Sequence, residues 1–122
     1  MTHPLVLVPT FNERGNLESF IAAVRSALPS ADILVIDDNS PDGTGALADD
    51  LAAVDPQIKV MHRSSKAGLG RAYLAGFAWA LERDYSHVFE IDADFSHSPA
   101  DLPRLLAATQ LSLIHISEPT RP

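Results

Sequence analysis

The chain contains four short, continuous runs of mostly apolar residues, each closed by a proline or by polar residues. The runs are residues 5–8, 33–36, 59–61 and 87–91. Continuous rather than alternating apolar residues are typical of strands that are buried on both faces, as in a parallel sheet covered by helices. The pattern therefore predicts four strands of such a sheet, the first ending before Pro9.

Helical spacing fills the segments between these runs, at residues 17–28, 43–54 and 70–83, and a fourth helix begins near Pro99. Apolar residues there recur at i, i+3 and i+4, the period of an amphipathic helix. The residues expected on the apolar stripes are Leu17, Phe20, Ile21, Val24 and Leu28, then Leu47, Leu51 and Val54, then Tyr73, Leu74, Phe77, Ala78 and Leu81. Alternating strands and helices predict an α/β fold, doubly wound and Rossmann-like, with a mostly parallel sheet and helices on both faces.

Residues 111–122 break this alternation and carry two prolines among their last four residues. The segment resembles translated sequencing-adapter DNA, so we interpret it as an artefactual tail that is foreign to the fold. Residues 1–110 are then one truncated domain. The alternative is a genuine C-terminal strand.

Composition narrows the classes of protein further. The formal net charge is -7, which disfavours nucleic acid as a partner. The chain has no cysteine, which excludes disulfides, thiolate metal sites and a cysteine nucleophile. No apolar run is long enough to span a bilayer, and the first residues lack the basic segment of a signal peptide. We therefore expect a cytoplasmic location.

Polar residues are concentrated directly after the four apolar runs, at residues 9–13, 37–44, 63–71 and 92–97. In open α/β sheets, ligands bind beyond the carboxyl ends of the strands. We therefore expect these four segments to form one composite binding crevice.

Asp92 and Asp94 are the strongest candidates for metal binding in this sequence. Two carboxylates one residue apart, just past a buried strand, can hold a hard divalent cation that also bridges substrate phosphates. Such an ion stabilises the charge that develops on a diphosphate leaving group. The alternative is a pair of solvated loop acids, but the acidic pair after a neighbouring run favours the metal site.

Three further residues are candidates for nucleotide binding. Asp38 can accept bonds from the N–H or hydroxyl groups of a nucleoside, although the Asp37–Asp38 pair can instead belong to a turn. Lys66, between glycine-rich residues before a helix, fits a phosphate contact, or else a solvated loop lysine. Phe11 can border a base or belong to the core.

Residues 8–13, 35–44, 66–70 and 92–99 together resemble the successive signatures of the dolichol-phosphate (polyprenol-phosphate) mannose synthases. These enzymes belong to glycosyltransferase family 2 and have the GT-A fold. The resemblance runs from about Leu5 to Leu106, in order and with natural spacing. The segments S-P-D-G-T and D-A-D-x-S-H-x-P are more specific than a bare D-x-D.

The resemblance implies an inverting, metal-dependent transfer of mannose from GDP-mannose to a polyprenyl (dolichyl) phosphate. It implies that Asp92 and Asp94 hold Mg²⁺ or Mn²⁺ and act in catalysis. The implied substrate-binding residues are Pro9, Phe11, Glu13, Ile36, Asp38, Lys66, Ala93 and Ser96. Some family members have Gln in place of Ser96. The implied location is the cytoplasmic face of the membrane.

Nothing after Gln110 matches the acceptor side of that family, so we expect the chain alone to be inactive. An alternative within the family is an enzyme that moves glucose or a modified sugar to a lipid phosphate. A receiver-type phosphoacceptor domain is disfavoured, because residues 60–63 contain no aspartate. An NAD-binding domain is disfavoured because no G-x-G-x-x-G follows the first run.

Overall fold

The computed structural model describes residues 3–64, 69–91, 93, 99 and 113–115. Within this part of the chain, five strands form one sheet in the order β3-β2-β1-β4-β5, and all neighbouring strands are parallel. The strands are β1 (Pro4–Thr10), β2 (Asp32–Asp37), β3 (Ile58–His62), β4 (His87–Glu90) and β5 (Leu113–His115). Strands β1 to β4 confirm the four that the apolar runs predict.

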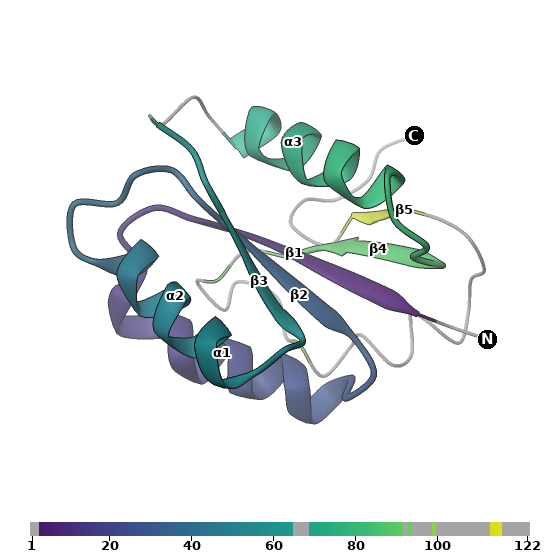
Figure 1. The fold of residues 1–122 in the computed structure, drawn as a ribbon, viewed down its shortest axis with the longest axis horizontal. Helices are drawn as coiled ribbons and strands as arrows, with labels where there is room; N and C mark the ends of the chain where they lie inside the picture. Colours follow the sequence, from purple (N-terminus) through teal and green to yellow (C-terminus); the bar gives the residue numbers. More distant parts are fainter. Residues whose placement is uncertain (1–2, 65–68, 92, 94–98, 100–112, 116–122) are drawn as a thin grey trace.

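Helices cover both faces of the sheet, as expected (Figure 1). They are α1 (Arg14–Ala27), α2 (Thr44–Val54) and α3 (Leu69–Leu81). Helices α1 and α2 lie on one face and α3 lies on the other. The predicted fourth helix falls outside the described residues, apart from Pro99, which is buried.

Strand β1 is buried along its whole length and separates the two halves of the core. Val6 and Val8 pack with the residues of α1, whereas Leu5 and Leu7 pack with those of α3. Because successive side chains of a strand point to opposite faces, an unbroken apolar run serves both layers at once. The five residues predicted on the first helical stripe are all buried in the same half as Val6, which confirms that stripe.

The predicted end of the first strand was wrong, because β1 continues through Pro9 to Thr10 and pairs Pro9 with Ile36 of β2. The carbonyl of Leu7 accepts a bond from the Ile91 N–H. The backbone polar groups of every second residue of β1, including Leu7 and Pro9, therefore point toward β4. The ladder with β4 ends at the pair Leu7↔Glu90. The nitrogen of Pro9 therefore faces the β4 side, beyond the last pair of that ladder, and the proline removes no bond of the β1–β2 ladder.

The apolar stripe predicted for α3 was wrong in part. Tyr73 is buried and Phe77 packs against the core as predicted, but Leu74, Ala78 and Leu81 are exposed, the two leucines by 69% and 71%. Ala72 and Ala80, which the predicted stripe did not include, are buried. The small residues Ala72, Gly76 and Ala80 recur every four positions and let the helix approach the sheet closely. A Cβ added to Gly76 would lie only 2.6 Å from Ile36 Cδ1. The need for small side chains at this contact, rather than the spacing of large ones, sets which face is buried.

Two further differences concern the ends of elements. Val54, predicted on the stripe of α2, is 82% exposed, although Leu47 and Leu51 pack against the core as expected. Residues 113–115 form the short strand β5, with Val88 opposite Leu113. This strand is the alternative that the sequence left open for the C-terminal segment.

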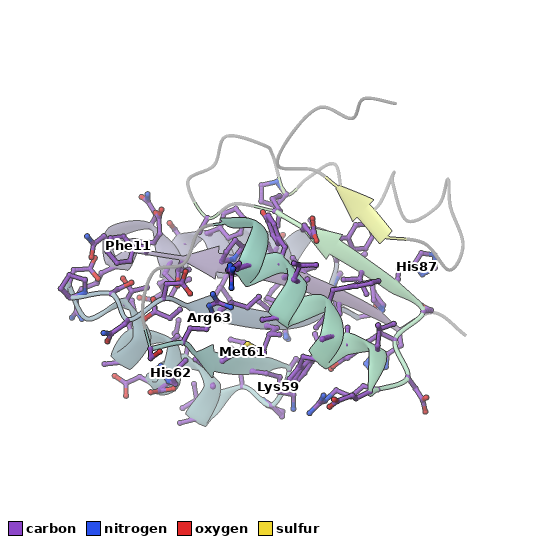
Figure 2. The ribbon with its side chains drawn as sticks, turned by 90° about the horizontal axis from the view of Figure 1, so that it is seen from above. Phe11, Lys59, Met61, His62, Arg63 and His87 are labelled. Carbon is purple, nitrogen blue, oxygen red and sulfur yellow. The ribbon has the colours of Figure 1, made fainter. Side chains whose placement is uncertain are left out.

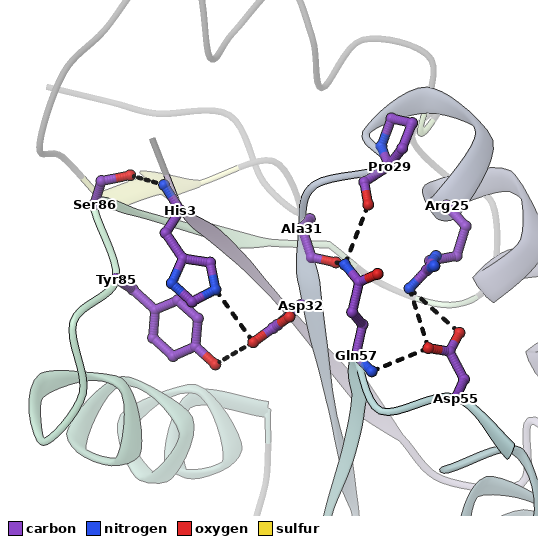
Figure 3. Close-up of polar contacts among 9 residues, drawn as sticks. All are labelled: His3, Arg25, Pro29, Ala31, Asp32, Asp55, Gln57, Tyr85 and Ser86. Carbon is purple, nitrogen blue, oxygen red and sulfur yellow. Dashed lines mark hydrogen bonds and ion pairs between the residues drawn. The ribbon is translucent and has the colours of Figure 1, made fainter. Parts of the chain in front are cut away.

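Polar contacts link the elements at the amino-terminal edge of the sheet (Figure 3). The Tyr85 hydroxyl donates a 2.7 Å hydrogen bond to Asp32 Oδ2, and the His3 ring nitrogen lies 3.4 Å from the same oxygen. Burial and the bond to Asp32 raise the pKa of Tyr85 well above its usual range. Arg25 of α1 pairs with Asp55 at the end of α2, with Nη1 3.2 Å from Oδ2. None of the helices in the described part of the chain is both long and apolar enough to cross a bilayer.

Two glycines of α3 provide a matched test of this close approach. A Cβ on Gly76 meets the closed core at Ile36 and Leu7, whereas a Cβ on Gly70 meets nothing within 4 Å. Both changes to alanine gain helix propensity, but overpacking at Gly76 costs about 1–3 kcal/mol. We expect Gly76→Ala to have a lower free energy of unfolding than Gly70→Ala by that amount, measured by urea denaturation. Equal stability of the two variants would contradict the packing.

Candidate functional site

The candidate site lies at the carboxyl-terminal edge of β1, β2 and β3. Figure 2 shows Phe11, His62 and Arg63 toward one end of the sheet and His87 toward the other. The parallel register fixes this arrangement, because Thr10 lies opposite Asp37 and Asp37 lies opposite His62. The segments that follow the three strands therefore start side by side, as the sequence predicts.

The segment after β2 closes the beginning of α1. The Ser40 hydroxyl accepts a bond from the Asn12 N–H at 2.9 Å, and the Thr44 hydroxyl accepts one from the Glu13 N–H at 3.0 Å. A carboxylate oxygen of Asp42 accepts a bond from the Arg14 N–H at 3.1 Å. The first backbone N–H groups of a helix have no partner within the helix. Here side chains from the β2–α2 turn supply partners at this helix start, so the two segments form one unit.

Asp37 is a structural residue of this unit. Its side chain is buried, and Oδ1 accepts bonds from the Thr10 hydroxyl at 2.8 Å and from the Ser40 hydroxyl at 2.6 Å. Oδ2 accepts a bond from the Ser40 N–H at 3.0 Å. A Cβ on Gly45 would lie 2.9 Å from this oxygen, so glycine lets α2 pack against the carboxylate. These contacts agree with the interpretation of Asp37 as a turn residue.

Asp42 organises the turn that enters α2. It accepts bonds from both the backbone N–H and the hydroxyl of Thr44. The Thr44 hydroxyl holds the pKa of the exposed Asp42 carboxyl below its usual range; desolvation opposes this effect, and the bonds from the Arg14 and Thr44 N–H groups add to it. Gly43 adopts the left-handed conformation with φ 91°, which glycine reaches without a steric penalty.

Asp38 is buried on the other face of β2 and pairs with Arg63, whose Nε lies 2.7 Å from Asp38 Oδ1. Both atoms are buried, and among the described residues this ion pair is the polar contact that each of them makes. Arg63 is a site residue that the sequence did not predict as the partner of Asp38. Their contact follows from the register of the folded sheet, in which Asp37 lies opposite His62 and the next residues are Asp38 and Arg63.

The structure brings together some of the predicted site residues. Pro9 and Ile36 are buried and face each other in the ladder, and the Asp38 N–H donates a bond to Thr10 O at 3.1 Å. Phe11 and Glu13 are half-buried just beyond β1, and Ala93 is buried. Four predicted residues, Lys66, Asp92, Asp94 and Ser96, lie outside the described residues. Within the described residues, no group of three or more acidic or histidine side chains could hold a metal.

The chain belongs to glycosyltransferase family 2, because the model of that family, "Glycosyl transferase family 2", matches residues 5–111. Membership of this family confirms the resemblance seen in the sequence and sets aside the receiver domain as an alternative.

Proteins similar to this chain have related names. A polyprenol monophosphomannose synthase of Mycolicibacterium smegmatis is 61% identical over 105 residues, which cover 85% of this chain and 40% of that protein. An undecaprenyl-phosphate mannosyltransferase of Micrococcus luteus is 53% identical over 106 residues, covering 87% of this chain and 44% of that protein. A dolichol-phosphate mannosyltransferase of Pyrococcus furiosus is 39% identical, covering 84% and 29%. The chain thus spans less than half the length of these relatives.

A solved structure has the same fold. It is a mannosyltransferase from Pyrobaculum calidifontis in complex with GDP-Man and Mn²⁺, with a TM-score of 0.58 and 22% sequence identity. The alignment covers 63% of this chain and 24% of that one. The likeness agrees with the GT-A fold that the family resemblance implies.

We expect Asp37→Asn to destabilise the fold, because an amide nitrogen would replace one of the two oxygens that now accept bonds from Thr10 and Ser40. A buried donor left facing another donor costs about 1–3 kcal/mol. Thermal and urea unfolding measure this loss. The exposed Asp50 of α2 provides the control, since Asp50→Asn changes the net charge equally. Equal stability of the two variants would be inconsistent with a structural role for Asp37.

Proposed function

We propose that this chain is the nucleotide-sugar-binding part of a metal-dependent enzyme that transfers mannose from GDP-mannose to a polyprenyl phosphate, with inversion. The observation that carries the proposal is the buried Asp38 carboxylate at the carboxyl-terminal edge of the sheet, in a family 2 chain. The 61% identity to a polyprenol monophosphomannose synthase supports the choice of sugar and acceptor.

The nucleoside is proposed to bind where β1 and β2 end. Asp38 would accept bonds from the N–H groups of guanine, and Phe11 would border the base with its half-buried ring. Pro9 and Ile36, which are buried and paired in the ladder, are proposed to form the floor of this site, and the half-buried Glu13 is proposed to lie at its rim. Lys66 is proposed to contact the phosphates.

Asp92 and Asp94 are proposed to hold the metal, Mg²⁺ or Mn²⁺. Their oxygen donors are of the type that both hard cations prefer. The strand that leads to them is held to β1 by the bond from Ile91 N–H to Leu7 O, and Ala93 between them is buried. A bound divalent cation supplies electrostatic stabilisation of the diphosphate leaving group. Ala93 and Ser96 are proposed to lie beside the nucleotide sugar.

The proposed reaction depends on positioning rather than on a general base. The phosphate of a polyprenyl phosphate is already anionic, so it can attack the anomeric carbon directly. One C–O bond forms as the bond to the diphosphate breaks on the opposite side, which inverts the configuration. The chain's own contribution is to hold the nucleoside rigidly at Asp38 and Phe11, so that the sugar is presented in line.

The proposed partners are GDP-mannose and a polyprenyl phosphate, with no role for nucleic acid given the net charge of -7. We propose that the parent enzyme acts in the cytoplasm, at the cytoplasmic face of the membrane, because its acceptor is a lipid. We also propose that residues 1–110 are a truncated GT-A domain and that residues 111–122 are foreign to it. The family match, which covers residues 5–111, supports this division.

We expect the chain to bind GDP more tightly with Mg²⁺ or Mn²⁺ than without, and Asp94→Ala to abolish the difference. Calorimetric titration of GDP into wild type and variant, with metal and with chelator, measures the effect. Losing a charge-assisted contact costs about 1.5–3 kcal/mol, or roughly tenfold or more in affinity.

UDP is the matched nucleotide control for this titration, because it carries the same diphosphate on a different base. Equal binding of GDP in all four conditions would rule out the metal assignment. Tighter binding of UDP than of GDP would rule out the guanine assignment and favour another sugar donor.

We expect the 122-residue chain to show no transfer of mannose to a short polyprenyl phosphate. Holding a reacting group even about 1 Å out of place can cost on the order of 10²-fold in rate. The relatives named for this activity are more than twice as long as the matched region. Transfer of radiolabelled mannose from GDP-mannose measures the activity, with GDP-glucose and UDP-glucose as alternative donors. Robust transfer of mannose by this chain would contradict the expectation of inactivity, and transfer of glucose would contradict the assigned sugar.

A further inference from the structure

Arg63 is fixed to the sheet at the point where β3 ends. Its backbone N–H donates a 2.8 Å bond to the carbonyl of Asp37, which continues the β2–β3 ladder one residue beyond His62. Its side chain is only 19% exposed. The position of the Arg63 backbone relative to Asp38 is therefore set by the sheet and not by a free loop.

The guanidinium of Arg63 makes two contacts with different elements. Nε lies 2.7 Å from Asp38 Oδ1, and Nη1 donates a 3.1 Å bond to the carbonyl of Arg71 in the first turn of α3. The guanidinium is planar and its nitrogens keep a fixed relative geometry. The Arg63 guanidinium therefore connects the Asp38 carboxylate to the start of α3.

This contact involves only one of the two Asp38 oxygens. Oδ1 is buried against Arg63 Nε at 2.7 Å. Oδ2 has no hydrogen-bond partner among the described residues, so Oδ2 is the oxygen available to accept bonds from a ligand. The opposite charge of Arg63 offsets the cost of burying a carboxylate that would otherwise be expensive to desolvate.

A neighbouring contact joins the same two segments. The side-chain nitrogen of Asn39 donates a 3.2 Å bond to the carbonyl of Ser64, directly after Arg63. Asn39 adopts a left-handed conformation with φ 55°, which asparagine tolerates better than most residues. The turn after β2 is thus tied to the segment after β3 on both sides of the Asp38–Arg63 pair.

We propose that Arg63 is a positioning residue for base selection: it orients the Asp38 carboxylate toward the base and couples that orientation to the start of α3. The inference rests on the proposed role of Asp38 in binding guanine. Arg63 itself is assigned no contact with the nucleotide. The predicted phosphate-binding residue Lys66 precedes α3, so the coupling would connect the base end and the phosphate end of the site.

Arg63→Lys tests the proposal in the full 122-residue chain. Lysine keeps the charge near Asp38, but its single ammonium group lacks the rigid fork that contacts Asp38 and α3 together. IDP is the probe of base selection because it lacks the 2-amino group of guanine. We expect wild type to prefer GDP over IDP in calorimetric titrations, and Arg63→Lys to lose about tenfold of that preference.

A measurement without ligand tests the coupling itself. In wild type, Asp38→Asn is expected to shift the backbone amide signals of Arg71 and Ala72 in two-dimensional NMR spectra. In the Arg63→Lys background the same change should leave these signals in place, because the connection is already broken. This double-mutant comparison separates an effect passed through Arg63 from two independent effects.

Arg25→Lys is the matched control, since Arg25 forms a partly buried ion pair with Asp55 at the opposite edge of the sheet (Figure 3). It should change neither the GDP preference nor the coupling. If Arg63→Lys keeps the full preference of wild type for GDP, or if Asp38→Asn alone leaves the α3 signals unshifted, the positioning role is overturned. The second criterion holds even if Arg63→Lys does not fold.

Failure of the proposed function gives a different result. If wild type binds GDP and IDP equally, the proposed guanine contact of Asp38 is wrong. The proposed role of Arg63 in base selection is then wrong as well. The amide signals still decide whether Arg63 couples Asp38 to α3.

Discussion

Parallel pairing of β1 with β2 fixes the geometry on which the candidate site depends. The ladder runs without interruption from Leu5 opposite Asp32 to Thr10 opposite Asp37, whereas the ladder of β1 with β4 stops at Leu7. Strands β1 and β2 therefore extend together past the end of β4. That extension carries Asp37 and Asp38 to the edge where both helical layers approach the sheet, and each carboxylate can meet a different layer.

The adjacent residues Asp37 and Asp38 have different surroundings because their side chains lie on opposite faces of the sheet. Asp37 points to the side of α1 and α2, where Thr10, Ser40 and Gly45 surround it. Asp38 points to the other side and meets Arg63. Alternation along the chain makes Asp37 a structural residue on one face and places Asp38, the proposed ligand-binding residue, on the other. Asp37 and Asp38 are therefore neighbours in the sequence without sharing one role in the structure.

Much of the fold followed from the sequence because continuous apolar runs and helical periodicity record burial directly. The four predicted strands β1 to β4, the three described helices and their placement on both faces agree with the structure, whereas β5 lies in the segment that we expected to be foreign. The stripe of α3 did not, because Ala72, Gly76 and Ala80 are buried for their small size, which hydrophobic periodicity does not measure. At the site, the position of Asp38 was predictable but its partner Arg63 was not, since their contact depends on the register of β3.

The backbone N–H groups at the start of α1 depend on side chains from a later segment, and this affects how the helix folds. Side chains of Ser40, Asp42 and Thr44 provide the partners for N–H groups at its start, although these residues lie beyond the next strand in the chain. A peptide of residues 11–28 lacks those partners and should fray at its amino end. Helix α1 is then completed only when β2 and the turn after it are in place. The proposed nucleotide site and the first helix should form in the same cooperative step, and an unfolding event that opens one should open the other.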